Sequence, residues 1–220
     1  MTMERKKSSM KRSKKRHARK RRSRISLVTP VILAVILIVV GLYYVNKYHQ
    51  HMEYVRYPLR HREILIETAR EHDLEPWHVA AVVCCESSFW ENAVSSVGAR
   101  GLMQIMPETG EWLAGKFDEE DSYTPDALFD PETNLKYGCW YLSWLMDRYD
   151  GDRTVVTAAF HAGQGKIDSW LEDPAISPDG VTLPVENIPF KETRAYVKRI
   201  LVAFEKYQEL YDFEEADKAA

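Results

Sequence analysis

Cysteine is scarce in this chain of 220 residues, which contains only Cys84, Cys85 and Cys139. Three cysteines are too few, and an odd number, for a framework of disulfides. We expect them to serve as small hydrophobic side chains of a core, although a bridge between Cys85 and Cys139 remains open. Their spacing, taken with His78, matches no zinc signature, so we expect no metal site.

The sequence also lacks long stretches of alternating apolar and polar residues, the pattern that predicts β-strands, and no internal repeat is visible. Apolar side chains instead recur at helical spacing, beginning near Leu59. A loop-rich segment at 172–189 is interrupted by four prolines. We therefore expect a mostly α-helical fold.

Charge is missing from residues 25–46. The segment from Ile25 to Val45 has 21 residues, and a helix of that length, at 1.5 Å per residue, would span about 30 Å of hydrocarbon. A cleaved signal peptide would have a shorter apolar core and a small-residue cleavage site, and neither is found here. The segment therefore predicts a transmembrane helix that acts as an uncleaved signal anchor.

Acidic residues are almost absent from residues 1–24, which hold 13 Lys or Arg, one Glu and a net charge of +12. A basic flank predicts a cytoplasmic N-terminus and attraction to the anionic inner leaflet. Basic runs also bind nucleic acid, but no aromatic residue that could stack on bases is interleaved here. We expect a membrane partner and no nucleic acid.

The rest of the chain, 47–220, is acidic, with a net charge of −15. We divide it into a short stalk (46–56), one domain (57–213) and an acidic C-terminal tail (214–220). The predicted topology places this domain outside the cytoplasm. Its expected helices begin at prolines that suit a first helical turn and continue toward the C-terminus: they start at Pro76, Pro107 and Pro131, and later helices cover 152–161, 165–171 and 190–213.

Glu86 follows seven consecutive apolar residues, VAAVVCC at 79–85. This run is apolar on every face, which predicts a helix that is buried all round. A carboxyl group at its end is desolvated, and desolvation raises the pKa of an acid. Glu86 is therefore a candidate general acid at neutral pH.

Four motifs follow one another along the chain: Glu86–Ser87 before the segment SSVGARGLMQIMP at 95–107, NLKYG at 134–138, AFHAG at 159–163, and IPFKETRAYV at 188–197. In this order and spacing they resemble the catalytic core of the soluble-type lytic transglycosylases. The resemblance covers about residues 57–210.

The resemblance implies a lysozyme-like helical domain that cleaves the β-1,4 bond between N-acetylmuramic acid and N-acetylglucosamine in peptidoglycan. It also implies a single catalytic acid, Glu86, which protonates the leaving oxygen and then deprotonates the C6 hydroxyl of the sugar. A 1,6-anhydro ring closes, and no cofactor is required.

The same resemblance assigns substrate-binding roles to other positions. Ser95 and Gln104 are expected to hydrogen-bond the sugar, Met106 to shape the cleft, and Tyr196 to approach the sugar or Glu86. Phe160 and His161 depart from the usual A-Y-N-A-G motif. The phenolic hydrogen bond is lost at Phe160, and His161 is expected to contact the substrate or Glu86.

Two other functions remain open. A hydrolytic muramidase of the goose-type lysozyme kind would use a second acid to position water, and Glu91 is the nearest candidate. A glycan-binding scaffold of the cell envelope would keep the fold without effective catalysis.

The aromatic residues Trp140, Tyr141 and Trp144 stand at helical spacing and are expected in the core.

Overall fold

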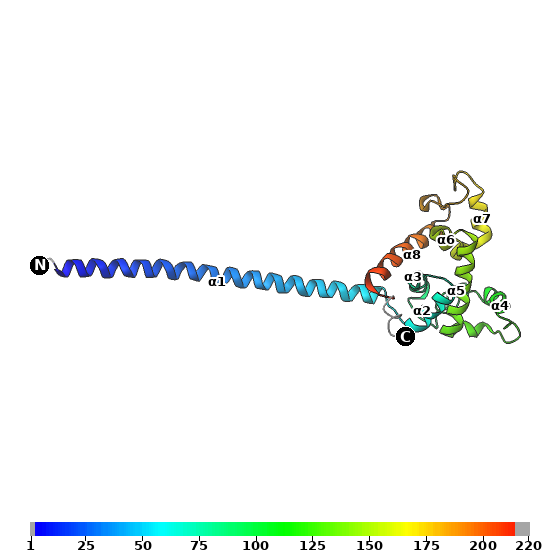
Figure 1. Cartoon of the computed structure of the whole chain (residues 1–220), viewed down its shortest axis with the longest axis horizontal. Coiled ribbons are helices and arrows are strands. Elements are labelled where there is room, and N and C mark those ends of the chain that lie inside the picture. Colours follow the sequence, from blue (N-terminus) through cyan, green and yellow to red (C-terminus); the bar gives the residue numbers. More distant parts are fainter. Residues whose placement is uncertain (1–2, 214–220) are drawn as a thin grey trace. The chain divides into compact units, whose positions relative to one another are not determined.

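The computed structural model describes residues 3–213, and their side chains from residue 29 onward. The acidic tail at 214–220 and the side chains of the basic tail at 1–24 lie outside this description. The chain divides into two compact units, residues 1–53 and residues 54–220 (Figure 1).

The first unit consists of most of helix α1, which runs without a break over Met3–Arg56. In the part of the chain that the structure describes, Thr29–Arg56 is the one stretch of helix that is long and apolar enough to cross a membrane. The side chains of residues 29–50 are all exposed. The segment at 46–56, expected as a stalk, is the last part of this helix.

The second unit is helical, as expected from the sequence, and among residues 54–213 the only β-structure is two isolated bridges. Nine further helical elements follow α1 within the described residues, and the α-helices among them are labelled in Figure 1. They are α2 (Arg62–Glu71), α3 (Pro76–Ser87), α4 (Pro107–Ala114), α5 (Pro131–Arg148), α6 (Arg153–Ala162), α7 (Gln164–Leu171), α8 (Lys191–Leu210), and the 3₁₀ helices η1 (Pro125–Phe129) and η2 (Val185–Asn187).

Helix starts follow the local chemistry of the sequence. Pro76, Pro107 and Pro131 each occupy the first turn of a helix, where the missing N–H is not needed. Asp130 caps α5, because its carboxylate accepts a hydrogen bond from the backbone N–H of Thr133 at 2.9 Å. Helix α2 begins later than its apolar pattern predicts, since His61 just before it has a left-handed backbone with φ of 51°.

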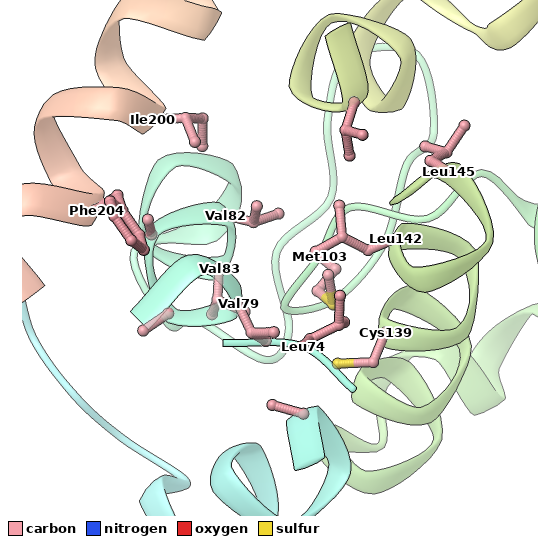
Figure 2. Close-up of a cluster of buried hydrophobic side chains, with 14 of the residues drawn as sticks. Leu74, Val79, Val82, Val83, Met103, Cys139, Leu142, Leu145, Ile200 and Phe204 are labelled. Carbon is pink, nitrogen blue, oxygen red and sulfur yellow. The ribbon is translucent and has the colours of Figure 1, made fainter. Parts of the chain in front are cut away.

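Helix α3 is the centre of the domain core. Its residues from Val79 to Val83 are all buried. Figure 2 shows α3 between Ile200 and Phe204 of α8 on one side and Met103 with the side chains of α5 on the other. The expectation of a helix buried all round is therefore met from Val79 to Val83, whereas Cys84 and Cys85 are only partly buried because the helix reaches the edge of the core there, just before Glu86.

All three cysteines are free. Cys139 is fully buried on α5, as expected for a small hydrophobic residue of the core. The bridge between Cys85 and Cys139 that the sequence left open is not formed.

Candidate active site

Glu86 lies in the last turn of α3, where the buried helix reaches the edge of the core. The helix ends here because Ser88 takes a left-handed conformation, and its N–H donates to the carbonyl of Cys84. The C-terminal end of a helix carries partial negative charge, which disfavours a carboxylate. The position therefore favours the neutral acid.

The contacts of Glu86 are dominated by α8. Tyr196, itself buried, donates its phenolic hydrogen to Oε1 of Glu86 at 2.6 Å. Burial raises the pKa of Glu86 to about 7, although the hydrogen bond from Tyr196 and the nearby guanidinium of Arg199 both act to lower it. Glu86 is thus poised to give up and regain a proton near neutral pH.

His161 lies beside this pair, at the end of α6. Its ring centroid is 4.5 Å from that of Tyr196, and its Nδ1 is 3.2 Å from the hydroxyl of Thr193. Burial lowers the pKa of His161, and Arg199 lowers it further, against a smaller opposing effect of Glu192. A neutral imidazole is therefore favoured at neutral pH, and its ring packs against that of Tyr196.

Phe160 precedes His161 and is half-buried, with its ring centroid 5.7 Å from that of Tyr141 on α5. Its ring keeps an aromatic surface at this position but supplies no hydrogen-bond donor.

For the glycan cleavage that the sequence resemblance implies, we predict that Phe160→Tyr raises turnover and changes substrate affinity less. The added hydroxyl supplies a donor, and an interaction made in the transition state appears in turnover rather than in binding. Steady-state kinetics on purified sacculi measure both quantities. Turnover that is unchanged or lower would mean that this hydroxyl has no role in the present site.

The segment between α3 and α4 carries three of the expected site residues. Oγ of Ser95 accepts hydrogen bonds from the backbone N–H of Val97 and Ala99, at 3.3 and 3.0 Å. Gln104 has a left-handed backbone, and its side-chain Nε2 donates to the carbonyls of Ala93 and Gly101, at 3.2 and 2.9 Å. In this structure both side chains therefore hold the loop itself.

Met106 is the third of these residues. It is half-buried and has an extended backbone immediately before Pro107, which opens α4. It therefore lies where the loop passes into a helix, and part of its side chain is available to a ligand.

Asn134 is a residue whose importance the motif alone does not reveal. It is fully buried on α5, and its Oδ1 accepts from the N–H of Met103 at 2.8 Å. Its Nδ2 donates to the carbonyls of Arg100 and Leu128, at 3.0 and 2.8 Å. A buried asparagine that satisfies three backbone groups fixes the loop at 95–106 against the core. Its position at the start of NLKYG was the one available signal.

Two further contacts complete the support of the loop. Ser87, next to Glu86, donates its hydroxyl to the carbonyl of Leu102 at 2.8 Å. Gly101 has φ of +75°, and a Cβ there would overlap the carbonyl of Leu128 and the amide of Asn134. The end of α3 and the loop are thus joined directly.

Arg199 was not expected from the sequence to belong to the site. It stands one turn after Tyr196 on α8, with its guanidinium carbon 5.8 Å from the Tyr196 ring centroid. Within the described residues, no group of three His, Cys, Asp or Glu side chains could hold a metal ion. The site therefore consists of one acid with a phenol, a cation and an imidazole around it.

Comparison with known proteins identifies the family of this chain. The model of the transglycosylase SLT domain matches residues 63–179. A soluble lytic murein transglycosylase of Salmonella typhimurium is 36% identical over 162 residues, which are 74% of this chain and 25% of that protein. A membrane-bound lytic murein transglycosylase C of Actinobacillus pleuropneumoniae is 30% identical over 161 residues, 63% of this chain and 43% of that protein.

Solved structures are also similar. The 70 kDa soluble lytic transglycosylase of Escherichia coli superposes with a TM-score of 0.65 at 32% identity, over 71% of this chain and 25% of that chain. An inactive glutamate-to-glutamine mutant of the lytic transglycosylase Slt from Pseudomonas aeruginosa gives 0.62 at 32% identity, over 74% and 27%. The chain spans about a quarter of the length of these soluble relatives.

Proposed function

We propose that this chain, which belongs to the transglycosylase SLT family, is a lytic transglycosylase of peptidoglycan. It cleaves the β-1,4 bond between N-acetylmuramic acid and N-acetylglucosamine and leaves a 1,6-anhydro end. The observation that carries the proposal is the partly buried Glu86, whose pKa is raised to about 7 and whose Oε1 accepts the hydrogen of Tyr196.

The reaction uses the two protonation states of Glu86 in turn. The neutral acid donates its proton to the glycosidic oxygen, so that the bond from C1 to this oxygen breaks and the leaving sugar departs as an alcohol. The resulting carboxylate then takes the proton of the C6 hydroxyl, whose oxygen bonds to C1. Glu86 ends protonated, and one carboxyl group serves both steps.

The neighbours of Glu86 suit the second half of this cycle. The hydrogen bond from Tyr196 and the positive charge of Arg199 both stabilise the carboxylate that forms after the first proton transfer. Burial favours the neutral acid that is needed first. The balance between these effects supports an acid that also acts as a base.

The hydrolytic alternative needs a second acid to position water. Glu91, its nearest candidate, has a carboxylate oxygen 3.3 Å from Nε2 of His61. The products distinguish the two reactions, since hydrolysis leaves a reducing end and transglycosylation leaves an anhydro end.

We also propose that residues 25–45 anchor the protein in the cell membrane, with the basic tail in the cytoplasm. The described part of this segment exposes apolar side chains on all sides of a single helix, which is the surface that lipid covers. The excess of basic residues before it supports the orientation. The catalytic domain then faces the cell wall, close to peptidoglycan.

We predict that protease added to intact, wall-stripped cells removes the catalytic domain and spares the basic tail. The apolar helix is the sole link between them, and the membrane shields it and the tail. Immunoblotting with tags at each end of the full chain measures the outcome. A soluble mature protein that begins near residue 45 would contradict the anchor.

A further inference from the structure

Three of the six tryptophans of the chain gather on the outer side of α4 and α5. The ring of Trp112 on α4 stands edge-on to Trp140, Tyr141 and Trp144 of α5, with centroids at 5.6, 6.1 and 6.3 Å. Tyr141 and Trp144 are stacked, 6.0 Å apart. We call these four residues the aromatic platform.

The platform is only partly buried, although the sequence pattern places its α5 members in the core. Trp112 is 43% exposed, and the three rings of α5 are half-buried. The core-facing stripe of α5 is filled by other side chains, among them the fully buried Leu142 and Leu145. The three rings of α5 pack against the core with part of their surface, while Trp112 extends the aromatic surface into solvent, where it is accessible to a ligand.

The platform is continuous with the candidate active site. Tyr141 lies 5.7 Å from Phe160, whose neighbour His161 lies 4.5 Å from Tyr196. Tyr196 in turn donates to Glu86. The ring contacts of the platform therefore reach Phe160 on α6, and the next residue of α6, His161, packs against the partner of Glu86.

The chemistry of these rings suits a sugar. A pyranose presents a face of C–H groups, which packs against a flat aromatic ring, while the indole N–H remains available for a hydroxyl or N-acetyl group. Nζ of Lys116 lies 5.0 Å from the centroid of Trp112 and places a positive charge beside the rings. This charge suits an acidic, peptide-bearing glycan better than an apolar protein surface.

We propose that the aromatic platform is a further glycan subsite, which binds amino-sugar units of the strand at a distance from the bond that is cut. The inference rests on the proposed function, because the occupant is a longer stretch of the same substrate. The platform then favours long strands over short fragments.

Binding to strands of different length tests this subsite. The full chain carrying Glu86→Gln is used, so that no strand is cut, with peptide-bearing glycan strands from sacculi sorted into long and disaccharide-length fractions. Trp112→Ala is expected to weaken binding of long strands by about 3- to 10-fold and to leave that of the short fraction unchanged. Trp90→Ala is the matched control, because Trp90 is 59% exposed and lies outside the platform.

A second variant separates the loss of the ring from a loss of packing. Trp112→Tyr keeps an aromatic face and is expected to restore most of the binding of long strands. Equal weakening of both fractions, or no weakening of either, would overturn the subsite while leaving the proposed function in place. If the Glu86→Gln chain binds neither fraction, the proposed function fails and the subsite fails with it.

Discussion

Glu86→Gln should lower the rate of glycan cleavage by about 10²- to 10⁴-fold, toward the upper end of that range, while the fold and glycan binding are retained. Glutamine has the shape of the acid and can still accept the hydrogen bond from Tyr196. It has no proton to donate at the first step and no carboxylate to accept one at the second. Release of muropeptides from purified sacculi measures the rate.

The parent protein should show a matching dependence on pH. The first step needs neutral Glu86, so the rate should fall as pH rises through the pKa of this group, which is about 7. Because the pKa of Glu86 is raised from its ordinary value of 4.5 to about 7, the folded protein holds this proton more tightly than the unfolded chain does. The free energy of unfolding should therefore decrease as pH rises from about 4.5 to 7. The Glu86→Gln variant should therefore be at least as stable as the parent above pH 7.

The control for this variant is Glu91→Gln, which makes the same chemical change at the acid paired with His61. It should leave the rate of the transglycosylase reaction within a few-fold of the parent. A strong loss at Glu91 would instead favour the hydrolytic alternative. Activity of Glu86→Gln within tenfold of the parent would exclude Glu86 as the catalyst.

Asn134→Ala should have the largest effect on stability, lowering the free energy of unfolding by about 3–5 kcal/mol. It leaves the N–H of Met103 and the carbonyls of Arg100 and Leu128 without their partner in the core. Chemical denaturation of the full chain in detergent, followed by tryptophan fluorescence, measures the loss. Because these groups fix the loop at 95–106, the rate of cleavage should fall even at denaturant concentrations that are too low to unfold the protein.

Asn187→Ala provides the comparison, since Asn187 donates a single hydrogen bond, to the carbonyl of Ile176 at 2.9 Å. It should cost about 1 kcal/mol and leave cleavage nearly unchanged. Similar losses for the two variants would show that Asn134 has no special place in the support of the loop.

Much of the fold follows from local features of the sequence. Pro76, Pro107 and Pro131 mark helix starts because the backbone restriction of proline acts on its own turn. The apolar run at 79–85 predicts the central helix, since no face of it could be solvated favourably. Glu86 stands out for the same reason, as the first carboxyl group after that run.

The partners of Glu86 could not be derived in this way. Tyr196 is 110 residues away along the chain, and the motif alone left open whether it approaches the acid or the sugar. Arg199 joins the site because it lies one turn further along α8. Such contacts depend on how α8 packs against α3, which no local pattern specifies.

The aromatic residues of α5 show a related limit. Helical spacing placed Trp140, Tyr141 and Trp144 in the core, but the structure leaves them half-buried around Trp112 of α4. Periodicity identifies a face of a helix but does not say whether a second element covers that face completely. The exposure of the platform therefore appears only once α4 and α5 are placed together.

The central claim is that a single carboxyl group, that of Glu86, catalyses cleavage with closure of a 1,6-anhydro ring in the sugar. Mass spectrometry of the products tests this claim most directly. Purified sacculi are digested with the full chain, and the muropeptides released are compared by mass, since an anhydro end is lighter than a reducing end by one water. We predict that the new ends are 1,6-anhydro-N-acetylmuramic acid, and that they are absent when Glu86 is replaced by Gln. New reducing ends in place of anhydro ends would contradict this account.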